Sequence, residues 1–355
     1  MSAIVTPRQS KAIDWLRFPL AAAVVLSHAG KTTTGFYDPD FCSSLRIFLS
    51  QGICRIAPPC FFFISGFLFF SKMQEWNTNI WLDKIKKRCR TILLPYFLWN
   101  ILCLLICNAY GWIRAGFNPE IVPISLLEAL EQNGWLNIFW ASTFGCPIDY
   151  PLWFIRDLII FVAITPLVFF FVKKSRFWGV IIMFVAGILI RSRDYEGLFF
   201  FVLGACYRLS PRDFLQDCSR IKWLAYVLTT LLALFIVFTF REHIEYYEYL
   251  KYLLVFFGTV SCINFSSFVS EHNLIPENEF LTSSGFFVYA SHAILILHDF
   301  AHYITLHLLP FTSVAGQCLV LFAKWVIAVG ICLGLYALMK KWTPKTLGVL
   351  TGNRA

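Results

Sequence analysis

Charged residues are scarce in this sequence of 355 residues, where Asp, Glu, Lys and Arg together make up 14%. Soluble globular domains carry about 25% charged and roughly 45–50% apolar residues, whereas 58% of this chain is hydrophobic. A soluble fold of this length would have too few polar side chains to cover its surface. The composition therefore argues against an ordinary soluble domain and predicts an all-α integral membrane protein.

Several local signals are also missing. The twelve cysteines include no C-x-x-C pair, so neither a zinc ribbon nor a thioredoxin-like site is indicated. The net charge of +9 is spread between apolar runs and forms no basic domain, so we expect no nucleic-acid partner. The first apolar run contains Asp14, Arg17 and Pro19 and has no cleavage site after it, which is unlike a signal peptide.

Long apolar runs fill most of the chain, and a helix needs about 20 such residues to cross the hydrocarbon core. The candidate runs are residues 13–30, 56–72, 91–110, 151–172, 176–190, 196–209, 221–240, 250–269, 284–306 and 316–340. We therefore expect about ten transmembrane helices in one bundle, with residues 1–355 forming a single domain and no separate soluble domain. Nineteen Lys and Arg residues lie in loops on the side of the N-terminus and eight in the opposite loops, which predicts that both termini are cytoplasmic.

The first run carries an unusual set of polar residues, Lys11, Asp14, Arg17 and His28. Ionisable groups inside a span are costly and are candidates for function. Asp14, Arg17 and His28 project from nearly one helical face, with Arg17 and His28 about 16 Å apart along the axis. One explanation is a polar stripe that lines a tunnel enclosed by protein. The other is an arginine that reaches the interface together with a packed histidine.

Two further segments leave alternatives open. Ser65-Gly66 lies inside a phenylalanine run, where small residues let either a neighbouring helix or a ligand approach closely. Residues 84–90 contain five Lys and Arg residues. This cluster fits a topology signal that contacts lipid headgroups, and it equally fits a phosphate site, because arginine binds phosphate through two hydrogen bonds.

A third segment combines Trp153, Arg156 and Asp157. Their spacing of three and four residues places them on one helical face. Because Arg156 and Asp157 are adjacent, we expect direct pairing between them to be strained. We therefore expect each to find its partner on another helix.

Histidines gather near the end of the chain. His292 follows Tyr289 by about one helical turn, and His298 and His302 have the i,i+4 spacing of a metal-binding pair. Only Asp299 adds a further ligand nearby. We therefore expect no metal site.

Five segments, taken in order, resemble the signatures of the acyltransferase family 3 membrane proteins. They are Lys11-x-x-Asp14-x-x-Arg17-x10-His28, Phe61-Phe62-Phe63-Ile64-Ser65-Gly66-Phe67, Lys87-x-x-Arg90 followed by Pro95-Tyr96, Pro151-Leu152-Trp153-Phe154, and Tyr289-x-x-His292. The resemblance covers nearly the whole chain. It departs at Trp153-Phe154-Ile155-Arg156-Asp157, where many members have Trp-Ser-Leu-x-x-Glu.

The resemblance implies a multi-pass enzyme of the bacterial inner membrane. Such an enzyme moves an acetyl or related group from cytoplasmic acyl-CoA to a surface glycan, a lipid-linked sugar or a small metabolite. The resemblance implies that His28 is the catalytic histidine. It also implies that Arg17, Lys87 and Arg90 contact the CoA phosphates. The partners it implies are membrane lipid and the sugar acceptor.

The chemistry leaves two routes open for His28, which acts either as a general base or as an acyl relay. We expect Asp14 to support catalysis by orienting Arg17, and we expect Ser65 or a backbone N–H to stabilise the oxyanion. A secondary transporter or exporter of lipid-linked sugars is the rival hypothesis, since it too would bury charges in its spans. The sequence shows no repeated halves, which many transporters have.

Overall fold

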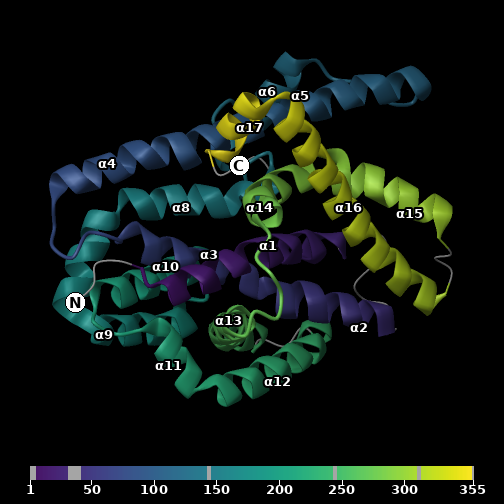
Figure 1. Cartoon of the computed structure of the whole chain (residues 1–355). Coiled ribbons are helices and arrows are strands. Elements are labelled where there is room, and N and C mark those ends of the chain that lie inside the picture. Colours follow the sequence, from purple (N-terminus) through teal and green to yellow (C-terminus); the bar gives the residue numbers. More distant parts are fainter. Residues whose placement is uncertain (1–4, 31–40, 142–144, 243–245, 310–312, 354–355) are drawn as a thin grey trace.

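The computed structural model describes residues 5–30, 41–141, 145–242, 246–309 and 313–353, which fold into helices joined by loops (Figure 1). The α-helices are α1 (Pro7–Ala29), α2 (Phe41–Ile47), α3 (Ala57–Phe69), α4 (Thr78–Arg88), α5 (Leu94–Phe117), α6 (Leu126–Asn133), α7 (Asn137–Trp140), α8 (Trp153–Ala163), α9 (Thr165–Ile190), α10 (Arg193–Leu209), α11 (Phe214–Arg220), α12 (Lys222–Arg241), α13 (Tyr247–Glu271), α14 (Glu279–Ser291), α15 (His302–Leu308), α16 (Val314–Trp342) and α17 (Pro344–Thr351). Short 3-10 or π-helical segments adjoin them, namely η1 (Phe48–Gly52), η2 (Ile53–Ile56), η3 (Cys89–Leu93), η4 (Tyr150–Leu152) and η5 (His292–Ala301).

Among the described residues, seven helical stretches are long and apolar enough to cross a membrane. They are Pro7–Ala29, Phe41–Phe69, Thr78–Phe117, Lys222–Arg241, Tyr247–Glu271, Glu279–Leu308 and Val314–Trp342. An eighth candidate is the pair Tyr150–Ala163 and Thr165–Ile190, which bends by 66°. The bend coincides with Pro166, because proline lacks a backbone donor and disfavours helix at the residue before it.

The prediction of ten spans is therefore not confirmed. The runs expected at 151–172 and 176–190 belong to α8 and α9, and α9 is interrupted at Arg176, where φ is 53°. The run expected at 196–209 is α10, whose 17 residues extend about 26 Å, short of the hydrocarbon thickness of about 30 Å. Hydropathy alone did not distinguish this short, largely buried helix from a full span.

Helix α1 lies among other helices (Figure 1), and it packs against α3, α13, α14 and α16. Its start is fixed by a capping box, in which the Thr6 hydroxyl accepts from the Gln9 backbone and the Gln9 side chain accepts from the Thr6 backbone. His28 is buried among these neighbours, whereas the side chain of Arg17 is 45% exposed.

Helices α3 and α10 approach each other through two glycines. A Cβ atom on Gly66 would lie 2.0 Å from the Phe201 carbonyl oxygen, and one on Gly204 would lie 2.1 Å from the Phe63 carbonyl oxygen. Both distances are far below van der Waals contact, so each position admits only glycine without backbone movement. Gly66 of the Ser65-Gly66 pair therefore serves helix packing.

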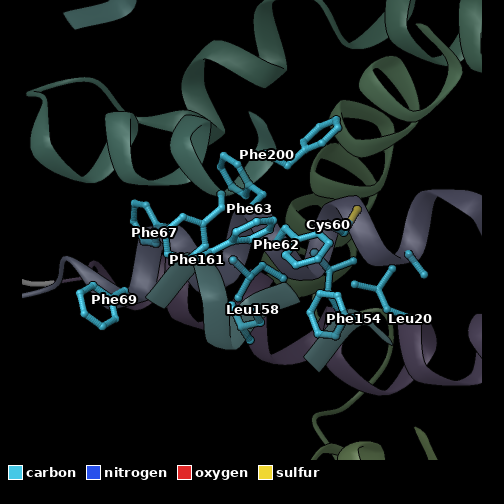
Figure 2. Packing of buried hydrophobic residues seen from close by; sticks show 14 of the residues in the cluster. Leu20, Cys60, Phe62, Phe63, Phe67, Phe69, Phe154, Leu158, Phe161 and Phe200 are labelled. Carbon is cyan, nitrogen blue, oxygen red and sulfur yellow. The ribbon is translucent and has the colours of Figure 1, made fainter. Parts of the chain in front are cut away.

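Phenylalanine side chains fill the space around this contact. Figure 2 shows Phe62, Phe63 and Phe67 of α3 beside Phe161 of α8 and Phe200 of α10. The ring centroids of Phe62 and Phe161 are 5.2 Å apart, in a tilted arrangement favourable for aromatic pairs. This packing fixes the position of α3 and α8, which form one wall of the cavity described next.

Candidate active site

A cavity of about 740 Å³ lies beside the N-terminal half of α1, and residues of α3, α8 and α14 also line it. Its charged lining residues are Asp14, Arg17, Arg88, Glu277, Glu279 and Lys340. Ser65 and Tyr289 belong to the same lining, and Phe61, Phe154 and Phe286 give it apolar walls. The cavity thus combines a charged region with an apolar one, as a site for a long amphipathic ligand requires.

Arg17 is held in this cavity by its neighbour on α1. Its Nη1 lies 3.1 Å from Oδ1 of Asp14, and the Ser10 hydroxyl donates to Oδ2 of Asp14 at 3.2 Å. Asp14 therefore orients Arg17, and it lies well away from His28 along the helix.

His28 lies further along α1, past the described lining of the cavity. Its side chain is buried. The His28 ring stacks on His292 with centroids 5.5 Å apart and an interplanar angle of 22°, and it meets the Tyr150 ring edge-on at 4.8 Å. Tyr289 connects the two regions, because it lines the cavity and its ring centroid is 6.5 Å from that of His292.

His292 is anchored in one tautomer. Its Nδ1 lies 2.8 Å from the Tyr289 carbonyl oxygen and 3.3 Å from that of Val288, so Nδ1 carries the proton. Nε2 is then the basic nitrogen, and no side chain or backbone group of the described residues bonds to it. His292 begins the π-helical segment η5, in which Ile294 and Leu295 depart from helical geometry. π-Helical segments inside helices frequently mark functional sites.

The segment before α8 contacts these histidines and Tyr289. The Tyr289 hydroxyl donates to the Pro151 carbonyl oxygen, and the Tyr150 hydroxyl lies 2.9 Å from Nε2 of His298. The bond from Tyr289 to Pro151 joins the Tyr289-x-x-His292 segment to the Pro151-Leu152-Trp153 segment. The two segments, far apart in sequence, meet at His28.

Asp149 is a residue that the sequence reasoning missed. It is 1% exposed, and neither carboxylate oxygen has a hydrogen-bond partner among the described residues. Its backbone N–H donates to Oδ1 of the buried Asn100 at 3.2 Å. Burial raises the pKa of the Asp149 carboxyl well above its ordinary value. The available signal was its position directly before the Tyr150-Pro151-Leu152-Trp153 segment.

The prediction that Arg156 and Asp157 would not pair directly was wrong, whereas Arg156 does find a partner on another helix, at Trp140 of α7. Nη2 of Arg156 lies 2.8 Å from Oδ1 of Asp157. Nη1 of Arg156 also donates to the carbonyl oxygens of Trp140 and Gly145 at 2.8 and 2.7 Å, and its guanidinium lies over the Trp140 ring. Trp153 lies under the guanidinium of Arg193 at 4.4 Å. None of the three expected residues Trp153, Arg156 and Asp157 lines the cavity.

The basic cluster contributes a different residue from those expected. Lys87 and Arg90 are exposed and do not line the cavity, whereas Arg88 between them does. Lys84 donates to the carbonyl oxygens of Phe69 and Ser71 at 2.6 and 2.7 Å. It thereby fastens α4 to the end of α3 and positions Arg88.

Comparison with known protein families matches residues 10–339 to the acyltransferase domain that defines acyltransferase family 3. The chain belongs to acyltransferase family 3. The chain is also 30% identical over 134 residues to the succinoglycan biosynthesis protein ExoH of Rhizobium meliloti (strain 1021). The aligned segment covers 37% of this chain and 33% of that protein. No solved structure matches the chain.

Proposed function

We propose that this acyltransferase moves an acyl group, acetyl in the first instance, from acyl-CoA to a hydroxyl of a glycan or a lipid-linked sugar. The observation that carries the proposal is the path along α1. A cavity with Arg17 in its lining reaches Tyr289, and Tyr289 adjoins the stacked pair of His28 and His292. The relative involved in succinoglycan biosynthesis supports a glycan acceptor.

The lining fits an acyl-CoA donor. Arg17, Arg88 and Lys340 are three cations for its phosphates, and arginine suits phosphate through paired hydrogen bonds. The distance of about 16 Å along α1 between Arg17 and His28 matches an extended pantetheine arm. Phe61 and Phe154 form apolar walls on the way. Exposed Lys87 and Arg90 then act as an outer basic patch that attracts the phosphates.

In the proposed reaction, His28 takes the proton of the acceptor hydroxyl as that oxygen bonds to the thioester carbonyl carbon. The C–S bond then breaks, and the departing CoA thiolate takes a proton back from the imidazolium. Ser65, which lines the cavity, is the proposed donor to the oxyanion. The alternative route forms a covalent acyl-His28 before the acceptor arrives, and intact-protein mass distinguishes the two routes.

We further propose that the enzyme lies in a bacterial inner membrane with both termini in the cytoplasm. The excess of Lys and Arg in the loops on that side supports this orientation. It places Arg88 and Lys340, two of the three cations in the cavity lining, on the side where acyl-CoA is made. The rival hypothesis of a lipid-linked sugar transporter is disfavoured by membership of an enzyme family.

The test uses purified full-length protein in lipid nanodiscs with acetyl-CoA labelled in the acetyl group. We expect label to pass to a glycan acceptor, and we expect His28→Ala to lower transfer by about 10²–10⁴-fold. His307→Ala is the matched control, since His307 is an exposed histidine away from the cavity. Unchanged transfer by His28→Ala at equal folded protein, or label that stays on CoA with wild-type protein, would refute the proposal.

A further inference from the structure

Helix α17 is built into the packing around the cavity, although it does not itself line the cavity. It contacts α5, α14 and α16, and Figure 1 shows it next to α5 at one end of α16. Its Leu347 and Leu350 side chains are 1% and 8% exposed. Both belong to the hydrophobic cluster that contains Ile92 and Trp99. Burial of these side chains fixes α17 against the helices that carry the cavity wall.

Two contacts of the α17 backbone determine where it lies. Nε1 of Trp99 in α5 donates to the carbonyl oxygen of Leu350 at 3.0 Å, and this bond is buried. Gly352 follows α17 with a φ of 65°, and a Cβ atom there would lie 2.2 Å from the Thr91 carbonyl oxygen. The left-handed φ and the backbone contact both require glycine. Gly352 therefore lies directly against the backbone of η3.

The segment η3 forms one wall of the cavity. Thr91 lies between Arg88 and Ile92 in the sequence, and both Arg88 and Ile92 line the cavity. The segment is π-helical, a rare geometry that frequently marks functional sites. The contact of Gly352 with Thr91 thus lies behind the residues that η3 presents to the cavity.

Helix α17 is also joined to the opposite wall through α16. Lys340, four residues before Pro344, lines the cavity, and its ammonium group is 5.7 Å from the centroid of the Tyr336 ring. The Tyr336 hydroxyl donates to the Ser283 hydroxyl at 2.8 Å, and Ser283 of α14 belongs to the cavity lining. The position of α17 therefore relates the wall made by η3 to the wall made by α14 and α16.

We propose that α17 is a positioning element of the donor site, which holds η3 so that Arg88 reaches the phosphates of acyl-CoA. Gly352 and Trp99 are its positioning residues. The inference rests on the proposed function and adds residues outside the cavity lining that determine donor affinity. Because Arg88 contacts the phosphate end of the donor, α17 acts on the binding of phosphate and not on the thioester.

The experiment uses the full-length protein in nanodiscs and measures the Kd for two donors. Acetyl-CoA carries the phosphates, whereas S-acetylpantetheine has the same thioester and arm without them. The variants are Gly352→Ala and Trp99→Phe. Gly334→Ala is the control for the first, since a Cβ atom there has open space around it in the described part of the chain. Trp112→Phe is the control for the second, because Trp112 of α5 also donates to a backbone carbonyl, that of Ile124, away from the cavity.

We expect the Kd for acetyl-CoA to rise about tenfold in Gly352→Ala, as weakening of one charge-assisted contact implies. Trp99→Phe should shift it in the same direction, and it carries the test if Gly352→Ala does not fold. The Kd for S-acetylpantetheine should stay unchanged in both variants, and both controls should bind as wild type. In the background of Arg88→Gln, Gly352→Ala should weaken acetyl-CoA binding no further, because residues that act through one contact are not additive.

Three outcomes overturn the inference alone. They are an unchanged Kd for acetyl-CoA in the folded variants, an equal loss of affinity for both donors, and a further loss in the Arg88→Gln background. The second would mean that α17 supports the fold of the whole cavity without positioning Arg88. Wild-type protein that binds neither donor overturns the donor site of the proposed function itself.

Discussion

Arg17 offers the most quantitative test of the donor site. The substitution Arg17→Gln removes the guanidinium from the cavity but keeps a polar side chain with a similar helix propensity. A hydrogen bond to a charged group contributes about 1.5–3 kcal/mol. The Arg17 side chain is 45% exposed, so solvent screening favours the lower end of that range. At about 1.4 kcal/mol per tenfold, we expect the Kd for acetyl-CoA to rise about tenfold.

The assay measures acetyl-CoA affinity directly and KM and kcat in steady state, because KM equals Kd only when chemistry is slow. We expect kcat to change much less than KM, since Arg17 lies about 16 Å along the helix from His28. Arg8→Gln is the matched control on the same helix. Arg8 pairs with Glu271 at 2.7 Å, its side chain is 51% exposed, and it does not line the cavity. An unchanged Kd in Arg17→Gln, or an equal rise in Arg8→Gln, would show that the cavity is not the donor site.

Three further predictions concern α3, η5 and the loop before α8. Gly66→Ala should lower the midpoint of thermal unfolding in detergent, at a cost of about 1–3 kcal/mol or more from overpacking against Phe201. Ser65→Ala should leave that midpoint unchanged and lower kcat. If Gly66→Ala and Ser65→Ala unfold at the same midpoint, the assignment of Gly66 to helix packing is wrong. His292→Gln should lower kcat with little change in acetyl-CoA affinity, because His292 stacks on His28 outside the cavity lining, and a normal kcat would remove His292 from the site. Burial raises the pKa of the Asp149 carboxyl in the folded protein. The protonated Asp149 side chain therefore adds most to the free energy of unfolding below the unfolded-state pKa of about 3.9. This contribution is lost as the pH rises toward the folded-state pKa, because the buried carboxyl then has to ionise. Asp149→Asn should therefore unfold at a higher temperature than wild type at neutral and alkaline pH, with the difference shrinking on acidification, and a difference independent of pH would refute the burial of a titrating carboxyl.

The sequence predicted the helical membrane fold and the family, and it placed Asp14, Arg17 and His28 on one helix, which is α1. These were readable because burial in lipid restricts composition strongly, and because helical periodicity relates Asp14, Arg17 and His28 without knowledge of any other helix. The five motifs could be placed in order along the chain for the same reason. Each is local, so its residues are visible in a short stretch of sequence.

Contacts between distant segments could not be predicted in this way. The guanidinium of Arg156 pairs with Asp157 and also donates to the carbonyl oxygens of Trp140 and Gly145, which no local pattern places beside it. The choice of Arg88 over its neighbours depends on how Lys84 fastens α4 to α3.

The predicted count of ten spans is not confirmed for a related reason. Helix α10 is apolar because it packs closely against α3, as the contact of Gly204 with Phe63 shows. A buried helix and a lipid-exposed helix have similar hydropathy, so length and neighbours decide whether a run spans the bilayer. The stacked histidines His28 and His292 and the buried Asp149 likewise appear only when α1, η5 and the loop before α8 are brought together.

The most direct measurement is an electron cryomicroscopy structure of the His28→Ala protein in nanodiscs with acetyl-CoA. We expect the diphosphate within hydrogen-bonding distance of Arg17, the pantetheine arm along α1, and the acetyl carbonyl next to position 28 and His292. Density for CoA outside the cavity, or an α1 helix whose Arg17 and residue 28 face lipid, would contradict the proposed path between the two ends of α1.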